Sequence, residues 1–134
     1  MKYLLFLFLN GCTMTPTSAQ LDLDQYRWQN RVILLFTTDQ EATTYRKQVE
    51  ALNADPGALR DRDLVVHTVT KKDEVLWRRY SADGAPFRCM LLGKDGGVKL
   101  NETEFVPSRR IFTTIDAMPM RRREMRERDQ NDRR

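Results

Sequence analysis

The feature that most constrains the fold is an unbroken apolar run at residues 32–36, which leads directly into a polar segment. Five consecutive apolar residues suit a strand covered on both faces, as in the centre of a parallel or mixed sheet. Residues 38–41 then match a capping box, with Thr38 at the cap and Glu41 three positions on, so we expect a helix to begin there. Ligands of α/β domains commonly bind at such a strand-to-helix junction. This one offers hydroxyls and a carboxylate, but no cysteine, histidine or glycine-rich loop.

The next elements predict a βαβ unit. Ala42, Tyr45, Val49 and Leu52 fall on one stripe of a helix that residues 53–57 should end. A second apolar strand is expected at 64–69. A strand, a helix and a second strand in this order form a right-handed crossover by strong default.

The second half predicts a hairpin between two helical segments. A short helix is expected at 73–80, then a loop ending in Pro86, a strand at 87–92, a tight turn at 95–97 and a short strand at 98–100.

A helix opened by residues 107–108 should follow the hairpin. Its inward residues should be Ile111, Phe112, Ile115 and Met118, with a break at Pro119. Residues 120–128 can resume as a helix, with Arg123–Glu127 and Glu124–Arg128 as exposed pairs.

The first 19 residues indicate an export signal and tether rather than part of the domain. A basic start precedes a seven-residue apolar run at 3–9, which is too short to span a bilayer as a helix. Residues 9–12 resemble a bacterial lipobox, in which Cys12 would carry the lipid. The alternative is cleavage after Ala19. We therefore expect a bacterial envelope protein, either lipid-anchored or soluble in the periplasm or secreted. Cys89 would be the sole thiol of the mature chain, so no internal disulfide is expected.

The net charge of +4 is a local property of the C-terminal segment. Residues 121–134 hold seven arginines against four acidic residues, whereas residues 3–120 are balanced. We expect a domain at 20–120 followed by this arginine-rich helix end or tail. No nucleic-acid partner is expected. An anionic membrane surface contacting Arg121, Arg122 and Arg123 is one possible partner.

The element order gives an α/β fold with helices on both faces of a mixed sheet. A βαβ half followed by a ββα half resembles the thioredoxin arrangement, and that likeness implies a cis peptide before Pro86. Three stretches resemble a peroxiredoxin-like domain family called P-DUDES, which is a domain of unknown function: residues 26–36 (YRWQNRVILLF), 91–100 (LLGKDGGVKL) and 115–121 (IDAMPMR). The resemblance covers roughly residues 21–128, and the third stretch is its most specific part. It implies an extracytoplasmic setting, and it brings no established reaction and no catalytic residues.

The turn after the first strand lacks the cysteine that thioredoxins and peroxiredoxins carry there. We therefore expect a non-catalytic domain that binds an envelope protein or a small ligand. Its groove would be lined by five residues: Thr37, Thr38, Asp39, Pro86 and Arg88. Asp39 is a candidate partner for the Arg88 charge.

Two other functions stay open. One is an atypical thiol or peroxide oxidoreductase that uses Cys89, although a cysteine in a covered strand is usually inert. The other is an architectural protein tethered at the membrane. His67 is the only histidine and has no partner motif, so we expect neither a metal ion nor a cofactor.

Overall fold

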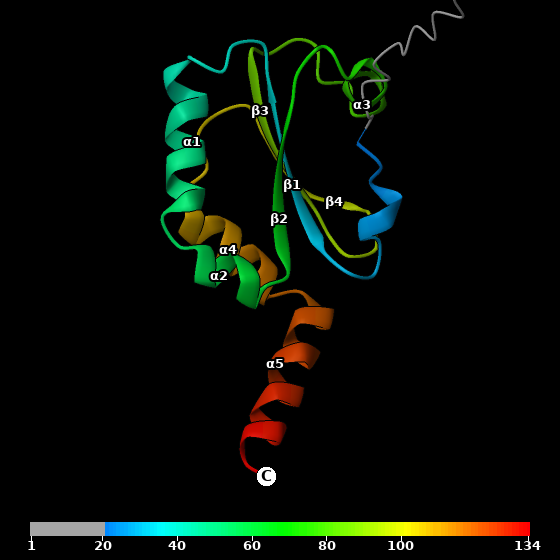
Figure 1. Ribbon diagram of the computed structural model, residues 1–134, viewed down its shortest axis with the longest axis vertical. Coiled ribbons are helices and arrows are strands. Elements are labelled where there is room, and N and C mark those ends of the chain that lie inside the picture. The colour runs from blue at the N-terminus through cyan, green and yellow to red at the C-terminus, as the bar shows by residue number, and fades with distance from the viewer. Residues whose placement is uncertain (1–20) are drawn as a thin grey trace, which may run out of the picture.

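The computed structural model describes residues 21–134. The expected lipid site at Cys12 and the alternative cleavage after Ala19 lie outside the described residues. Four strands form one mixed sheet in the order β2-β1-β3-β4 (Figure 1). The strands are β1 Arg31–Thr37, β2 Leu64–Val69, β3 Phe87–Leu92 and β4 Val98–Glu102.

β1 is the central and most buried strand, as its apolar run predicts. It runs parallel to β2 and antiparallel to β3, and every one of its seven residues is buried. β4 completes the hairpin with β3, with a register shift at Leu91/Leu92. β2 forms where the second apolar strand is expected, but it lies at the edge of the sheet and is only half-buried.

Helices cover both faces of the sheet (Figure 1). α1, α2 and α4 pack on the face that carries Ile33, Leu35 and Leu91, whereas α3 and the 3₁₀ helix η1 pack on the face that carries Leu34 and Phe36. α5 projects from the lower end of the sheet. The bounds are η1 Asp24–Tyr26, α1 Thr43–Asn53, α2 Pro56–Asp61, α3 Glu74–Arg79, α4 Ser108–Asp116 and α5 Pro119–Asp132. None of these helices is both long and apolar enough to cross a bilayer.

The stripe predicted for α1 is confirmed for Tyr45, Val49 and Leu52, whereas Ala42 precedes the helix and the capping box is wrong. Leu52 is buried, and Tyr45 and Val49 pack against the same core. The helix begins at Thr43 with Ala42 at its cap, and no side chain caps it. The polar residues before it close turns of their own instead, because the Asp39 carboxylate accepts from the Glu41 amide at 2.9 Å.

Two proline predictions have different outcomes. α4 ends at Asp116 and Pro119 is the first residue of α5, so the break expected at Pro119 is confirmed. Residues 21–134 contain no cis peptide bond, so the cis form implied for Pro86 is wrong and this bond has the isomer that prolines usually adopt.

The helix α2 was not predicted, since Pro56 and Gly57 were assigned only to the end of α1. Pro56 instead takes the first helical position, and the Asp55 carboxylate caps the helix by accepting from the Ala58 amide at 2.9 Å.

Candidate functional site

The turn after β1 uses most of its polar groups internally. The Thr37 hydroxyl is buried, donates to the Asp39 carbonyl at 2.8 Å and accepts from the Asp39 amide at 3.1 Å. The Asp39 carboxylate is engaged with the Glu41 amide. Only Thr38 of the three predicted turn residues lines an open hollow.

This hollow lies where the β1–α1 turn meets the loop before β3. The Thr38 amide donates to the Pro86 carbonyl at 3.0 Å, so the predicted proximity of these two residues is confirmed. The hollow, which we call the turn hollow, has a volume of about 240 Å³. Its lining residues are Thr38, Lys71, Trp77, Asp83, Gly84, Ala85 and Pro86.

The turn hollow combines one aromatic side chain with one charge of each sign. The Trp77 indole N–H donates to the Asp83 carboxylate at 2.8 Å, which fixes both side chains. The Lys71 ammonium lies 6.0 Å from the centre of the Trp77 ring. The sequence placed Trp77 in a short helix without linking it to this site. The signal that could have found the link is the single short loop that joins α3 to Pro86.

Arg88 lies outside the lining of the turn hollow, and its expected partner is wrong. Its guanidinium donates to the Asn101 side-chain oxygen at 2.8 Å, across the β3–β4 hairpin. Asp39 makes no ion pair within residues 21–134. Of the five predicted groove residues, Thr38 and Pro86 line the turn hollow, and Thr37, Asp39 and Arg88 do not.

Cys89 is enclosed in the core on the sheet face opposite to α3. Its side chain is fully buried among apolar residues. Burial first, and then the nearby Glu102 carboxylate, raise the pKa of this thiol to about 12. At neutral pH it is a protonated thiol, and it does not line the turn hollow.

His67 is tied to an aromatic neighbour rather than to a ligand set. One ring nitrogen lies 2.8 Å from the Tyr26 hydroxyl, and the two rings are 5.3 Å apart. Partial burial lowers the pKa of His67, so the imidazole is neutral at pH 7. Within residues 21–134, no group of three His, Cys, Asp or Glu side chains could hold a metal ion.

A cluster of charges joins the start of β1 to α5. Arg31 is 1% exposed, and its guanidinium donates to both Glu124 carboxylate oxygens at 3.2 Å. Lys94 donates to Glu124 at 2.7 Å and to Asp63 at 2.9 Å. Burial alone would raise the pKa of Glu124, but the bonds from Arg31 and Lys94 outweigh burial and hold this pKa below its ordinary value.

A second cluster holds the same helix from another side. The Arg121 guanidinium is 2% exposed and bonds Asp116 at 3.1 Å and Asp61 at 2.7 Å. Arg128 also pairs with Asp61, and Arg62 pairs with Asp116 at 2.9 Å. Burial opposes ionisation of Asp61 and Asp116, yet their arginine partners keep the pKa of each carboxyl below its usual value.

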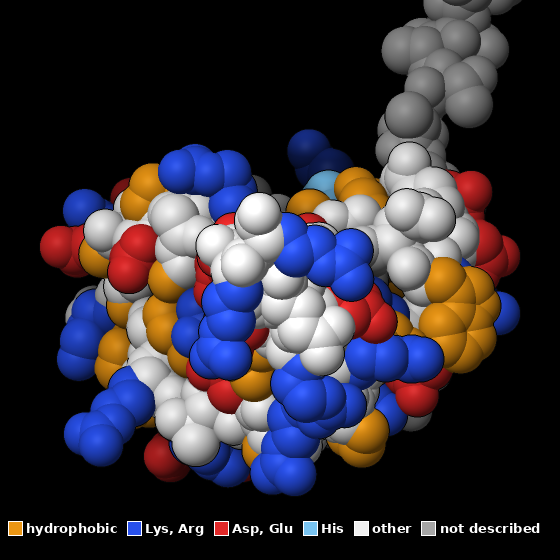
Figure 2. Space-filling model, turned by 90° about the horizontal axis from the view of Figure 1, so that it is seen from below, with side chains coloured by type: hydrophobic (Ala, Val, Ile, Leu, Met, Phe, Trp, Pro, Cys, Tyr) orange, Lys and Arg blue, Asp and Glu red, His pale blue; other side chains and the backbone are white. Residues whose placement is uncertain are grey.

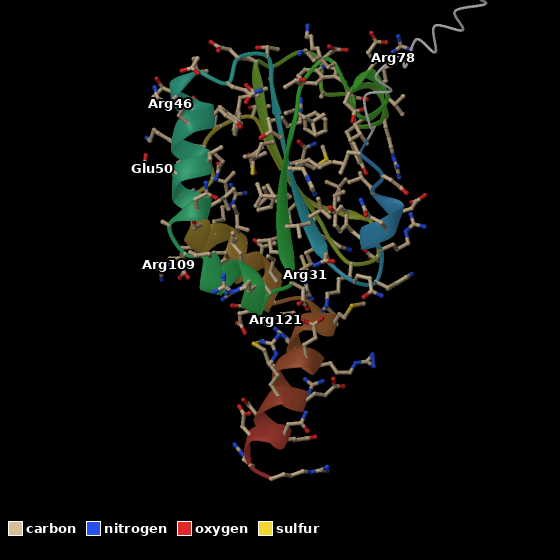
Figure 3. All side chains as sticks on the ribbon, in the orientation of Figure 1. Arg31, Arg46, Glu50, Arg78, Arg109 and Arg121 are labelled. Carbon is tan, nitrogen blue, oxygen red and sulfur yellow. The ribbon has the colours of Figure 1, made fainter. Side chains whose placement is uncertain are left out.

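The predicted Glu124–Arg128 pair on α5 is therefore wrong, and no ion pair joins Arg123 to Glu127 within residues 21–134. Glu124 and Arg128 bond residues of the domain body rather than each other. Arg121 is buried and paired (Figure 3), so it cannot contact a membrane surface as expected. Arg122 and Arg123 are exposed.

The element order, the sheet topology and the meeting of Thr38 with Pro86 define a thioredoxin-like α/β domain without a cysteine in the turn after its central strand. The chain belongs to the family described as Domain of unknown function (DUF4174), whose model matches residues 22–124. Comparison with curated proteins gave no match.

Three solved structures show the same fold. A Plasmodium vivax 2-Cys peroxiredoxin in its reduced form is 15% identical, with a TM-score of 0.53 over 72% of this chain and 82% of its own. Thioredoxin-2, titled as a component of malaria parasite protein secretion machinery, is 17% identical. Its TM-score is 0.53, and the match covers 66% of this chain and 84% of thioredoxin-2. A structure titled as a malarial protein is 17% identical. Its TM-score is 0.52, and the match covers 65% of this chain and 94% of that protein. These likenesses confirm the thioredoxin-like fold and the peroxiredoxin-like resemblance.

Proposed function

We propose that this chain is an exported, non-catalytic thioredoxin-like domain that binds a protein or small ligand in the turn hollow. The observation that carries the proposal is the composition of that hollow. An aromatic ring, an ammonium and a carboxylate surround it, while the thiol of Cys89 is buried on the other face of the sheet. Aromatic side chains beside a few placed polar groups are typical of binding sites.

The geometry of the hollow supports binding rather than chemistry. The Thr38 hydroxyl donates to the Pro86 carbonyl at 3.4 Å, so its proton is held by an acceptor that cannot act as a general base. Gly84 has a φ of 97°, and a Cβ placed there would meet no atom within 4 Å. The loop is thus open on the side where a ligand would enter.

The alternative of a thiol or peroxide oxidoreductase has less support. Such an enzyme needs a thiolate that reaches its substrate. Cys89 is completely buried, and its pKa of about 12 leaves almost no thiolate at neutral pH.

Binding in the turn hollow is tested by site-specific photo-crosslinking in the native host. A photoreactive residue at Lys71 should yield a discrete adduct, detected as a mass increase of the recovered protein. The matched control places the same residue at Arg46, an exposed position on α1 (Figure 3). The same adducts at both positions, or none at Lys71, would argue against this site.

Export is tested on the same material by intact-mass measurement. A lipidated chain starting at Cys12 or a chain starting at Gln20 would support the proposal. A chain that retains Met1 and is recovered with the cytosolic fraction would contradict it.

A further inference from the structure

A second and larger hollow lies at the other end of β1, where the β3–β4 turn meets the junction of α4 and α5. We call it the basal pocket. Its volume is about 440 Å³, within the range of small-molecule sites. Its lining residues are Arg31, Gly93, Lys94, Asp95, Lys99, Met118, Pro119 and Met120.

All eight lining residues come from the three stretches on which the family resemblance rests, at 26–36, 91–100 and 115–121. These stretches are far apart in the chain, and the fold brings them together at one place. The turn hollow uses none of them, so the proposed function leaves them unexplained.

The floor of the basal pocket carries buried cationic donors that are not fully used. Arg31 is 1% exposed, and its Nε has no hydrogen-bond partner among residues 21–134. The Lys94 side chain is 10% exposed. An ammonium has three N–H donors, and Lys94 uses one on Asp63 and one on Glu124, which leaves one for another acceptor.

The start of α5 adds a source of positive potential that does not depend on Arg31 and Lys94, whose charges are compensated by Glu124 and Asp63. Met118 occupies the cap position without a side-chain hydrogen bond, and the first bond of the helix runs from the Arg122 amide to the Met118 carbonyl at 3.0 Å. The amides of Met120 and Arg121 precede that bond. α5 points away from the body (Figure 1), and the N–H groups of a helix point toward its N-terminal end, which is where Met118, Pro119 and Met120 line the pocket. A 14-residue helix carries about half a positive charge at this end.

The one acidic group in the lining is already neutralised. The Asp95 carboxylate accepts from the Gly97 amide at 2.9 Å and from Lys99 at 3.0 Å. The other wall is apolar and consists of Met118, Pro119 and Met120. Seen from this end, the surface shows many basic side chains with hydrophobic ones between them (Figure 2).

We propose that the basal pocket binds a small amphipathic carboxylate. Its carboxylate would accept from Lys94 and from the first amides of α5, and its alkyl or aryl part would pack on the two methionines. A carboxylate suits this pocket because one ammonium hydrogen and two neighbouring amides match its two oxygens. The proposal is independent of the turn hollow and of any partner bound there.

Octanoate is the probe for this proposal, titrated into the full chain by calorimetry. Saturable binding is expected, with chemical-shift changes at the Met120 and Arg121 amides in NMR spectra. Octanol, which lacks the charge, and acetate, which lacks the chain, should each bind at least about tenfold more weakly. Equal or tighter binding of octanol or acetate would overturn the proposed ligand class, and absence of octanoate binding would overturn the site.

Two matched variants test the location without disturbing the ion pairs. Met120→Asp places a carboxylate in the lining, and Met125→Asp places one on the same helix outside the lining. The first should weaken octanoate binding by about tenfold or more through like-charge repulsion, and the second by less than about twofold. If both variants bind octanoate equally well, the pocket is not the binding site.

Discussion

Replacing Glu124 by Gln should destabilise the domain far more than its place in a mostly exposed helix suggests. The Glu124 carboxylate receives three hydrogen bonds, two from Arg31 and one from Lys94. Arg31 is 1% exposed, so loss of the carboxylate charge leaves a guanidinium buried without its counter-ion.

The magnitude follows from the burial of the two partners. Removal of one partner of a buried pair costs about 3–5 kcal/mol. Glutamine keeps one acceptor oxygen, and the Glu124 side chain is 19% exposed, so we expect a loss of roughly 2–3 kcal/mol of unfolding free energy. With a urea m-value of about 1.5 kcal/mol/M, the midpoint should fall by roughly 1.3–2 M.

The assay is urea unfolding of the full chain, followed by fluorescence of the buried Trp77. Glu127→Gln is the matched control, because Glu127 is exposed on the same helix and should change stability by less than about 0.5 kcal/mol. The double variant Arg31→Met with Glu124→Leu removes both charges and should recover most of the loss. Equal stability of the Glu124 and Glu127 variants would refute the reasoning.

Three further predictions concern other buried groups and the acidic side chains. Gln48→Leu should cost about 3 kcal/mol, because the fully buried Gln48 amide bonds both the N–H and the C=O of Val106 at 2.8 and 2.9 Å, whereas Gln40→Leu on the surface should change urea stability little. Cys89 in the native protein should react with iodoacetamide only through unfolding, and rapidly in denaturant; fast labelling without denaturant would contradict its burial. The native pKa values of Glu124, Asp61 and Asp116 are lowered, so their stabilisation is complete above about pH 5 and is lost as the pH falls through the native values. Urea midpoints measured from pH 7 to pH 3 should therefore decline below pH 5, less steeply in Glu124→Gln, and a flat profile would contradict the prediction.

The strands and the α1 and α4 stripes could be predicted because each has a local cause. The apolar run of β1 predicts burial on both faces of the strand, and the spacing of Ile111 and Ile115 predicts the buried face of α4. The fold class then follows from the order of the elements and the handedness of the crossover.

The starts of the helices were predicted less well because the same residues support competing turns. The segment from Thr38 to Glu41 satisfies the capping pattern, yet the Asp39 carboxylate prefers the amide two residues on, so the helix starts later. Asp55 and Pro56 match the start of α2, but a proline that follows a helix is equally typical of the end of that helix.

The charge clusters could not be predicted because their members are far apart in the chain. Glu124 lies 93 residues from Arg31, and Arg121 lies 60 residues from Asp61. Spacing on one helix favours the four-apart pairs, and only the fold shows that these side chains turn toward the body. The basal pocket has the same origin, although the resemblance had already selected the three stretches that form it.

The dependence of Arg31 on Glu124 has a consequence for biosynthesis. A chain made from its N-terminus contains the whole central strand long before residue 124 exists, so the nascent domain carries an uncompensated cation in the strand it must bury. Closing that loop of 93 residues comes late and is slow compared with local helix formation. Until then the polypeptide should stay loosely packed and sensitive to proteases.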